Sequence, residues 1–150
     1  MRNTVKRLWI KNPRLTWDPV DGEAMDAGVV VCDGKIVERV VAGADPVAPC
    51  DETFDASGLV LVPGLINTHH HFYQTLTRAH RKALNKPLFP WLEALYPVWA
   101  GLTPEMIDLS TRLAAAELML SGCSTAVDHH YVFPGGLESA IDVQANAMAG

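Results

Sequence analysis

The sequence predicts an α/β fold in which a parallel sheet follows a region of short strands, and three observations support this prediction. Residues 1–62 alternate short apolar runs with turn residues, which is typical of strands. Residues 59–66 form an apolar run that ends in histidines, the pattern of a strand buried on both faces. Helix signals over residues 103–122 precede a second strand at residues 124–128, and a strand–helix–strand unit of this spacing makes the two strands parallel.

The clearest short strands form a hairpin. Two runs rich in valine, residues 29–32 and 35–41, are joined by Asp33 and Gly34. An Asp-Gly pair supplies the positive φ angles of a type I′ turn, which joins antiparallel strands tightly. Because an isolated hairpin is only marginally stable in water, the strands of residues 1–62 need further partners.

Start and stop signals frame the helix between the two parallel strands. Thr103 is the expected N-cap, Pro104 suits the first helical position, and Glu105 favours the positive end of the helix dipole. Gly122 is the expected stop. Residues 72–102, which carry three prolines, are predicted to form a long loop at the carboxyl end of the first strand.

The last residues continue a helical pattern. Apolar residues recur at helical spacing from Leu137 to Met148, close to the final Gly150. Two parallel strands cannot close a barrel by themselves. The sequence is therefore expected to be the N-terminal third of a longer natural chain.

The composition is that of a globular protein with free thiols. The 150 residues are 49% hydrophobic and carry a formal net charge of −5, which argues against a nucleic-acid-binding surface. The basic cluster at residues 78–82 is expected to be a solvated loop, with a phosphate or partner site as the alternative. Three cysteines without paired spacing favour a reducing, cytoplasmic location. With no signal-peptide core and no 18-residue apolar stretch, no membrane partner is predicted.

Two histidines at the end of the first parallel strand are the predicted metal ligands. Residues i and i+2 of a strand point to the same side, so His69 and His71 share one face and His70 points to the other. Their Cα atoms are expected roughly 6.6 Å apart, a spacing at which two imidazoles can converge on one ion. A pair of hydrogen-bonded core histidines is the alternative. Pro63 and Gly64, which interrupt the strand just before, favour the metal site.

Three segments carry a resemblance to a known family. Residues 63–71, Pro-Gly-Leu-Ile-Asn-Thr-His-His-His, resemble the first-strand signature of the metal-dependent amidohydrolase superfamily. Within that superfamily, residues 67–78, 91–99 and 121–131 together resemble the 8-oxoguanine deaminases. The resemblance extends over nearly all of residues 59–133.

The resemblance implies a (β/α)8 TIM-type barrel preceded by a small β-sandwich domain. Residues 1–62 would be the N-terminal part of the sandwich, and residues 63–150 the first strands and helices of the barrel. It also implies one divalent metal ion, with zinc as the default for imidazole ligands and iron or manganese as alternatives. In the resembled family the other ligands are histidines after the fifth and sixth strands and an aspartate after the eighth. These and the glutamate that acts as general acid would lie beyond residue 150, so no catalytic residue is expected within this segment.

Gln74, three residues after His71, is the predicted substrate-binding residue. In the resembled guanine-type deaminases a glutamine at this spacing binds the purine edge, and an amide offers both a donor and an acceptor. A solvated loop residue is the alternative. Trp91, Tyr96 and Trp99 are expected to pack in the core or the loop, with stacking on a flat heterocycle as the alternative.

Polar residues also end the second parallel strand. Asp128, His129 and His130 lie at its carboxyl end, on the expected active face. One of the two histidines is expected to touch substrate, or both to support the metal ligands, and Asp128 or His130 as a third ligand is the alternative. His80 is expected to be exposed and Cys123 to be structural.

The implied activity is hydrolytic deamination of a purine-type heterocycle, with 8-oxoguanine giving urate and ammonia. Guanine deaminase, s-triazine hydrolase and cyclic amidase activities are alternatives within the superfamily. An alternative of another class is a non-catalytic metal-binding fragment. The expected partner is a small nucleobase-like molecule, and neither nucleic acid nor a membrane is expected to bind. The aromatic-rich segment could serve as a contact in a homo-oligomer, which stays an alternative.

Overall fold

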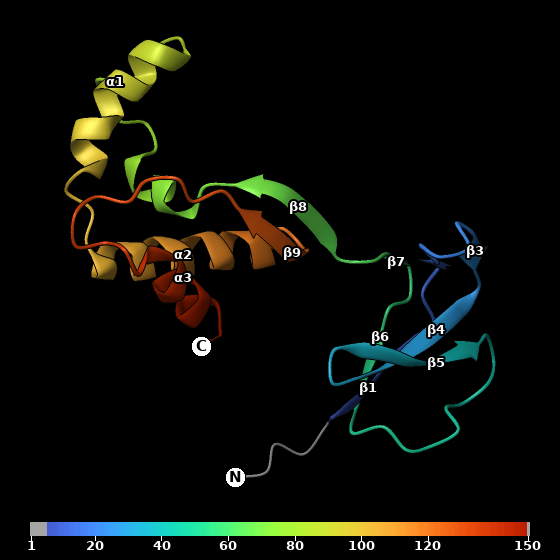
Figure 1. Cartoon of the computed structure of the whole chain (residues 1–150). Helices are drawn as coiled ribbons and strands as arrows, with labels where there is room; N and C mark the ends of the chain where they lie inside the picture. Colours follow the sequence, from blue (N-terminus) through green and yellow to red (C-terminus); the bar gives the residue numbers. More distant parts are fainter. Residues whose placement is uncertain (1–5, 150) are drawn as a thin grey trace. The chain divides into compact units, whose positions relative to one another are not determined.

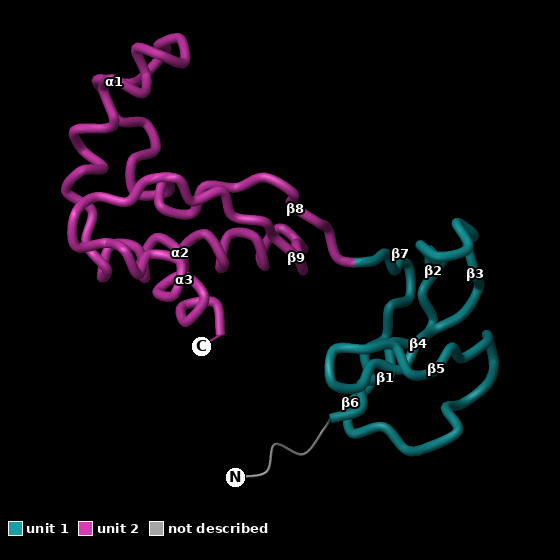
Figure 2. The backbone as a smooth tube through the Cα atoms, in the orientation of Figure 1, with its two compact units in different colours: residues 1–63 teal, residues 64–150 magenta. Residues whose placement is uncertain are grey.

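The computed structural model describes residues 6–149, which fall into two compact units (Figures 1 and 2). The division lies between Pro63 and Gly64. Each unit has its own sheets, and among residues 6–149 only the second unit contains helices. Among the described residues, no helix combines the length and the apolar character needed to cross a membrane.

The first unit is built from two small sheets. The larger has four strands in the order β5-β4-β1-β6, and the smaller has three in the order β3-β2-β7. Within the larger sheet, β1 pairs antiparallel with β4 and parallel with β6. The bounds are β1 (Arg7–Lys11), β2 (Leu15–Trp17), β3 (Ala24–Met25), β4 (Ala27–Cys32), β5 (Lys35–Val41), β6 (Glu52–Asp55) and β7 (Val60–Leu61).

The predicted hairpin is confirmed as β4 and β5. Its turn residues Asp33 and Gly34 have φ angles of 51° and 69°, the positive values that a type I′ turn requires. The additional partners that this hairpin needs are β1 and β6. A hydrogen bond of 2.6 Å from the hydroxyl of Thr16 to the carbonyl oxygen of Ala27 ties the smaller sheet to β4.

The second unit contains the predicted strand–helix–strand element. The parallel strands β8 (Leu65–His70) and β9 (Cys123–Asp128) are connected through η1 (Phe72–Thr77), α1 (Leu88–Trp99) and α2 (Pro104–Leu120), and α3 (Ala140–Ala149) follows β9. Thr103 caps α2 as expected, because its Oγ1 accepts a hydrogen bond of 3.3 Å from the backbone N–H of Met106.

The apolar run of residues 59–66 is interrupted at Pro63 and Gly64, as predicted, and contributes to two strands, β7 and β8. Its burial differs from the prediction. The start of β8 is exposed rather than buried on both faces, with 59% of Leu65 and 67% of Ile66 accessible. Within residues 6–149, β8 pairs with β9 alone, so no second neighbouring strand covers it.

The three prolines of residues 72–102 predicted one long loop, and this prediction is wrong. The segment contains the 3-10 helix η1 and the twelve-residue helix α1. Pro90 lies in the first turn of α1, where a missing N–H costs nothing because that N–H has no partner within the helix. Only Pro97 lies deeper in the helix, near its end.

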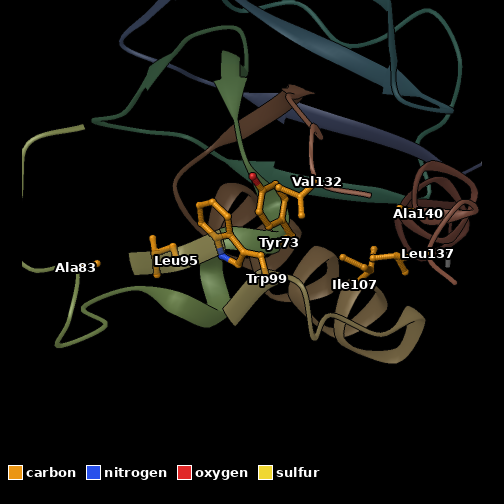
Figure 3. Packing of buried hydrophobic residues seen from close by; sticks show 8 residues of the cluster. All are labelled: Tyr73, Ala83, Leu95, Trp99, Ile107, Val132, Leu137 and Ala140. Carbon is orange, nitrogen blue, oxygen red and sulfur yellow. The ribbon is translucent and has the colours of Figure 1, made fainter. Parts of the chain in front are cut away.

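The core of the second unit forms around two aromatic rings that are completely buried. Tyr73 from η1 and Trp99 from α1 meet edge to face, with ring centroids 5.2 Å apart (Figure 3). The indole N–H of Trp99 donates to the hydroxyl of Thr77 over 3.2 Å. Trp99 is therefore a core residue, as expected, and it anchors the short helix that carries Gln74. The other buried members of the cluster are Ala83, Leu95, Ile107, Val132, Leu137 and Ala140.

A close approach between the two parallel strands requires glycine at position 64. A Cβ atom at Gly64 would lie 2.5 Å from Cβ of Ser124 in β9. We expect Gly64→Ala to lower the free energy of unfolding by about 1–3 kcal/mol, the usual cost of overpacking, in chemical denaturation of the full-length protein. Ser124→Gly removes the opposing atom and should restore most of the loss in the double variant. Equal losses in the presence and absence of Ser124→Gly would contradict this explanation.

Candidate metal centre

The candidate site lies where the two parallel strands end. His70 in β8 pairs in register with Asp128 in β9, so the residues that follow both strands meet at one edge of the sheet. A pocket of about 330 Å³ opens beside the histidines. Its lining comes from the end of β8, the segment that follows it and the start of α1, and consists of His69, His70, His71, Gln74, Thr75, Thr77, Arg78, Ala79, His80, Ala83, Leu84 and Trp91.

The imidazoles of His69 and His71 converge. Their Nε2 atoms are 3.0 Å apart, although His71 lies one residue beyond the end of β8. Nδ1 of His71 is 2.6 Å from the carbonyl oxygen of His129. Because a carbonyl can only accept a hydrogen bond, Nδ1 carries the proton, and Nε2 of His71 keeps its lone pair.

The Nε2 atoms of His69 and His71 are placed so that both could bind one metal ion. Two nitrogens bound to one tetrahedral zinc at about 2.0–2.1 Å lie roughly 3.3 Å from each other, close to the observed separation. An imidazole whose other nitrogen donates to a backbone carbonyl is the usual state of a metal-ligating histidine. Among residues 6–149, no group of three or more His, Cys, Asp or Glu side chains is arranged to hold an ion. The described residues thus bring two imidazole nitrogens, the candidate metal ligands, to one point.

The residues at and just after the end of β9 lie beside this pair without joining it. The ring of His129 stacks on that of His69, with centroids 4.6 Å apart and planes 27° from parallel. Asp128 directs its carboxylate to the backbone N–H of Phe72, and Nε2 of His130 contacts the carbonyl oxygen of Val132. The alternative of Asp128 or His130 as a third ligand is therefore not supported.

Gln74 is held in place rather than solvated. Its Nε2 donates to the hydroxyls of Tyr73 and Tyr131 over 3.2 and 3.1 Å. Burial raises the pKa of Tyr73, so that hydroxyl stays neutral. The ring of Tyr131 also meets His71 edge to face at 5.2 Å. Sequence reasoning missed Tyr131, and the available signal was its position two residues after His129, beside the strand end.

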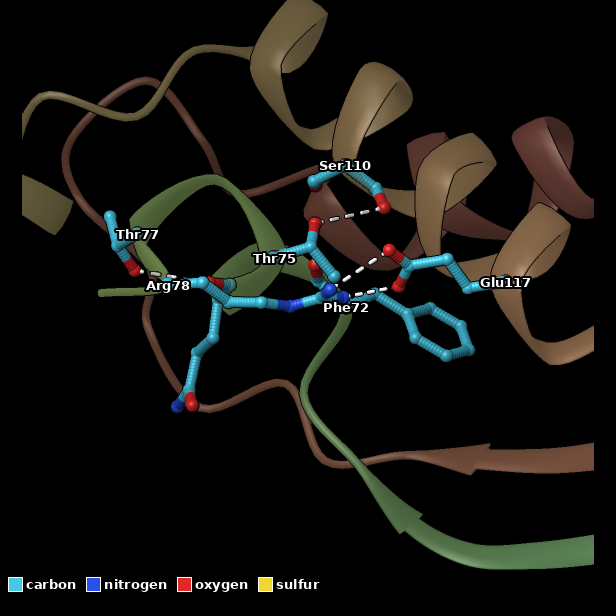
Figure 4. Close-up of polar contacts among 7 residues, drawn as sticks. Phe72, Thr75, Thr77, Arg78, Ser110 and Glu117 are labelled. Carbon is cyan, nitrogen blue, oxygen red and sulfur yellow. Dashed lines mark hydrogen bonds and ion pairs between the residues drawn. The ribbon is translucent and has the colours of Figure 1, made fainter. Parts of the chain in front are cut away.

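The short helix η1 that presents Gln74 is fixed to α2 by polar contacts (Figure 4). The hydroxyl of Thr75 lies 3.2 Å from the carbonyl oxygen of Ser110. The guanidinium of Arg78 forms a two-pronged ion pair with Glu117 and holds the pKa of that carboxyl below its usual range. Arg78 thus forms an ion pair with α2 while its side chain stays exposed, as do Arg81 and Lys82 of the predicted basic loop.

The structure also places His80, Trp91 and Cys123, for which predictions were made from the sequence. His80 is half-buried and lines the pocket, so the expectation that it is exposed is wrong. Trp91 is half-buried, lines the same pocket and packs on Trp99 with ring centroids 5.4 Å apart. Sγ of Cys123 lies 3.1 Å from the carbonyl oxygen of Thr125, as suits a structural thiol.

Residues 60–149 match the amidohydrolase family. The chain belongs to this family. It is 60% identical over 144 residues to an 8-oxoguanine deaminase of Pseudomonas aeruginosa, covering 96% of this chain and 32% of that protein. A 5-methylthioadenosine/S-adenosylhomocysteine deaminase of Natronomonas pharaonis is 42% identical over 70% of this chain and 24% of its own length.

Solved structures of the amidohydrolase family agree in fold with this chain. The atrazine chlorohydrolase of Arthrobacter aurescens TC1, solved as a complex with zinc, superposes with a TM-score of 0.82 at 27% identity. The match covers 95% of this amidohydrolase chain and 33% of the chlorohydrolase. The chain thus spans about a third of the length of this deaminase and of this chlorohydrolase, and in its described part the sheets form no closed barrel.

The partly buried imidazole of His130 makes stability depend on pH. Burial, the largest cause, lowers the pKa of His130, against smaller raising effects of the Val132 carbonyl and the Asp128 charge. The unfolded chain then takes up the proton at a higher pH, so stability is kept above about pH 6.5 and lost as the pH falls through the lowered pKa. We expect His130→Gln to reduce this loss in urea unfolding between about pH 7 and 5. An unchanged pH slope in that variant would exclude His130 as its source.

Proposed function

We propose that the full-length protein is a metal-dependent aminohydrolase that converts 8-oxoguanine and water into urate and ammonia. The observation that carries the proposal is the convergence of the two Nε2 atoms of His69 and His71 beside the fixed amide of Gln74. The 60% identity to an 8-oxoguanine deaminase supports this choice of substrate. Because the chain spans a third of that relative, the activity belongs to the full-length protein.

We further propose the architecture that completes the site. Residues 1–62 form part of a small β-sandwich domain, and residues 63–150 form the first strands and helices of a (β/α)8 barrel. The division at Pro63 and the parallel pair β8 and β9 support this assignment. Three free cysteines support a cytoplasmic location.

In the proposed mechanism, His69 and His71 would hold one divalent ion, zinc by default, through Nε2. A divalent ion held there would lower the pKa of water towards 7 and make hydroxide available at neutral pH. The carbonyl of His129 keeps the proton of His71 on Nδ1, so that Nε2 stays a lone-pair donor. Gln74 orients the purine ring through its edge so that the carbon bearing the amino group is the one attacked. The leaving ammonia needs a proton, and its donor is expected beyond residue 150.

A triazine substrate is the second candidate. The chain superposes on the zinc-bound atrazine chlorohydrolase at 27% identity, and a triazine presents a flat nitrogen heterocycle to the same pocket. Side-by-side turnover of 8-oxoguanine, guanine and a hydroxy-triazine by the full-length protein separates the candidates. We expect the highest kcat/KM for 8-oxoguanine, and a higher value for either rival would replace it as the assigned substrate.

The metal ligands can be tested directly. We expect His69→Ala and His71→Ala in the full-length protein to remove most bound metal and to lower ammonia release by more than about 100-fold, the upper range for residues that only support ligands. His70→Gln is the matched control for metal content, because His70 lies between the two ligands without joining their contact. Metal retained in both alanine variants would favour the alternative that His69 and His71 are hydrogen-bonded core histidines. Wild-type protein that binds metal without releasing ammonia would favour the alternative of a non-catalytic metal-binding protein.

The substrate role of Gln74 predicts a graded series. Gln74→Leu should lower kcat/KM for 8-oxoguanine by about 10- to 100-fold, because a polar ring edge loses its partner. Tyr131→Phe, which removes one hydroxyl that holds the amide, should cost about 2- to 10-fold. Metal content, measured by elemental analysis, should stay at the wild-type value in both. Unchanged kinetics in Gln74→Leu would place the purine edge elsewhere.

A further inference from the structure

Asp128, which the sequence presented as a possible ligand, joins three elements of the second unit. Its Oδ1 accepts a hydrogen bond of 2.7 Å from the backbone N–H of Phe72, the first residue of η1. Its Oδ2 accepts one of 2.8 Å from Nε2 of Gln144 in α3. Both bonds are charge-assisted, which makes them stronger than bonds between neutral groups.

Phe72 needs this partner. It is the residue directly after the candidate ligand His71, and it is buried. His71 occupies the N-cap position of η1, but its side chain makes no capping hydrogen bond. The carboxylate of Asp128 therefore caps η1 from a neighbouring strand, and without it a buried N–H would be left unpaired.

His129, the residue after Asp128, also contacts the segment that carries the candidate ligand His71. Its backbone N–H donates to the carbonyl oxygen of His70 over 2.7 Å. Its carbonyl oxygen accepts from Nδ1 of His71 over 2.6 Å. Residues 128 and 129 thus contact three consecutive residues, one before the ligand, the ligand itself and one after it. The contact between the His129 carbonyl and Nδ1 of His71 is the one that sets the direction of Nε2.

Gln144 is the outer support of this arrangement. It is a buried polar side chain, 6% exposed, on a helix that begins twelve residues after Asp128, at Ala140. A buried amide without a partner is costly, and its Nε2 is directed at the carboxylate. We propose that Asp128 and Gln144 are positioning residues for the metal ligand His71. They hold the strand end at which the His129 carbonyl orients the ligand ring. This inference depends on the proposed metal site at His69 and His71.

The test measures zinc affinity in the full-length protein. Chelator-stripped protein is titrated with zinc against a chromophoric chelator. We expect Asp128→Asn, which keeps the size and removes the charge, to weaken zinc binding by about 10- to 100-fold, and Gln144→Met to weaken it by about 10-fold. Asn146→Leu is the matched control, because Asn146 is an exposed amide on the same helix, and it should bind like the wild type. Since both residues act through one contact, the double variant should lose little more than Asp128→Asn alone.

A spectroscopic readout separates positioning from general stability. The visible absorption of cobalt in place of zinc should change in Asp128→Asn and Gln144→Met and stay unchanged in Asn146→Leu, while thermal unfolding of the metal-free proteins reports folding. If Asp128→Asn does not fold, Gln144→Met decides. Wild-type affinity and cobalt spectra in that variant, with binding lost in His69→Ala, would overturn the inference and leave the proposed function standing. Zinc binding that survives both His69→Ala and His71→Ala would overturn both.

Discussion

The hydrogen bond between Nδ1 of His71 and the carbonyl oxygen of His129 is the contact on which the candidate site depends. It joins the ends of two strands that are far apart in the sequence, and it decides which nitrogen of the ligand carries the proton. A rotated ring, or a proton on Nε2, would leave a single imidazole facing the ion position. The parallel pairing of β8 and β9 makes this bond possible, because it brings both carboxyl ends to one edge of the sheet.

The surrounding structure stabilises the same edge from several directions. The helix η1 is held by Trp99 through Thr77 and by α2 through Arg78 and Glu117. This fixed helix carries Gln74 at the rim of the pocket that the histidines line. The candidate metal ligands and the proposed substrate contact are thus supported by one buried aromatic core, so the spacing between them does not depend on a mobile loop.

The exposed side chains of β8 belong to an apolar strand rather than to a polar loop. Leu65 and Ile66 are apolar strand residues, yet more than half of each is accessible. Amidohydrolase relatives are about three times as long as this chain, since the chain covers 32% of the 8-oxoguanine deaminase. A strand whose pattern is that of a doubly buried strand, with one neighbour in the described part, is consistent with the proposed barrel.

Local chemistry alone determined the elements that depend on neighbouring residues. The Asp33-Gly34 turn, the Thr103 cap and the shared side of His69 and His71 all follow from φ preferences, capping and strand periodicity, which act over a few positions. Only the tertiary structure decided the roles that depend on distant partners. It turned Asp128 into a cap for Phe72, paired Arg78 with Glu117, and placed Tyr131 against Gln74. The α1 helix was also not predicted from the sequence. Its prolines suggested a loop, but proline is tolerated in the first turn of a helix. Its apolar face is stabilised by a core that no local pattern reveals.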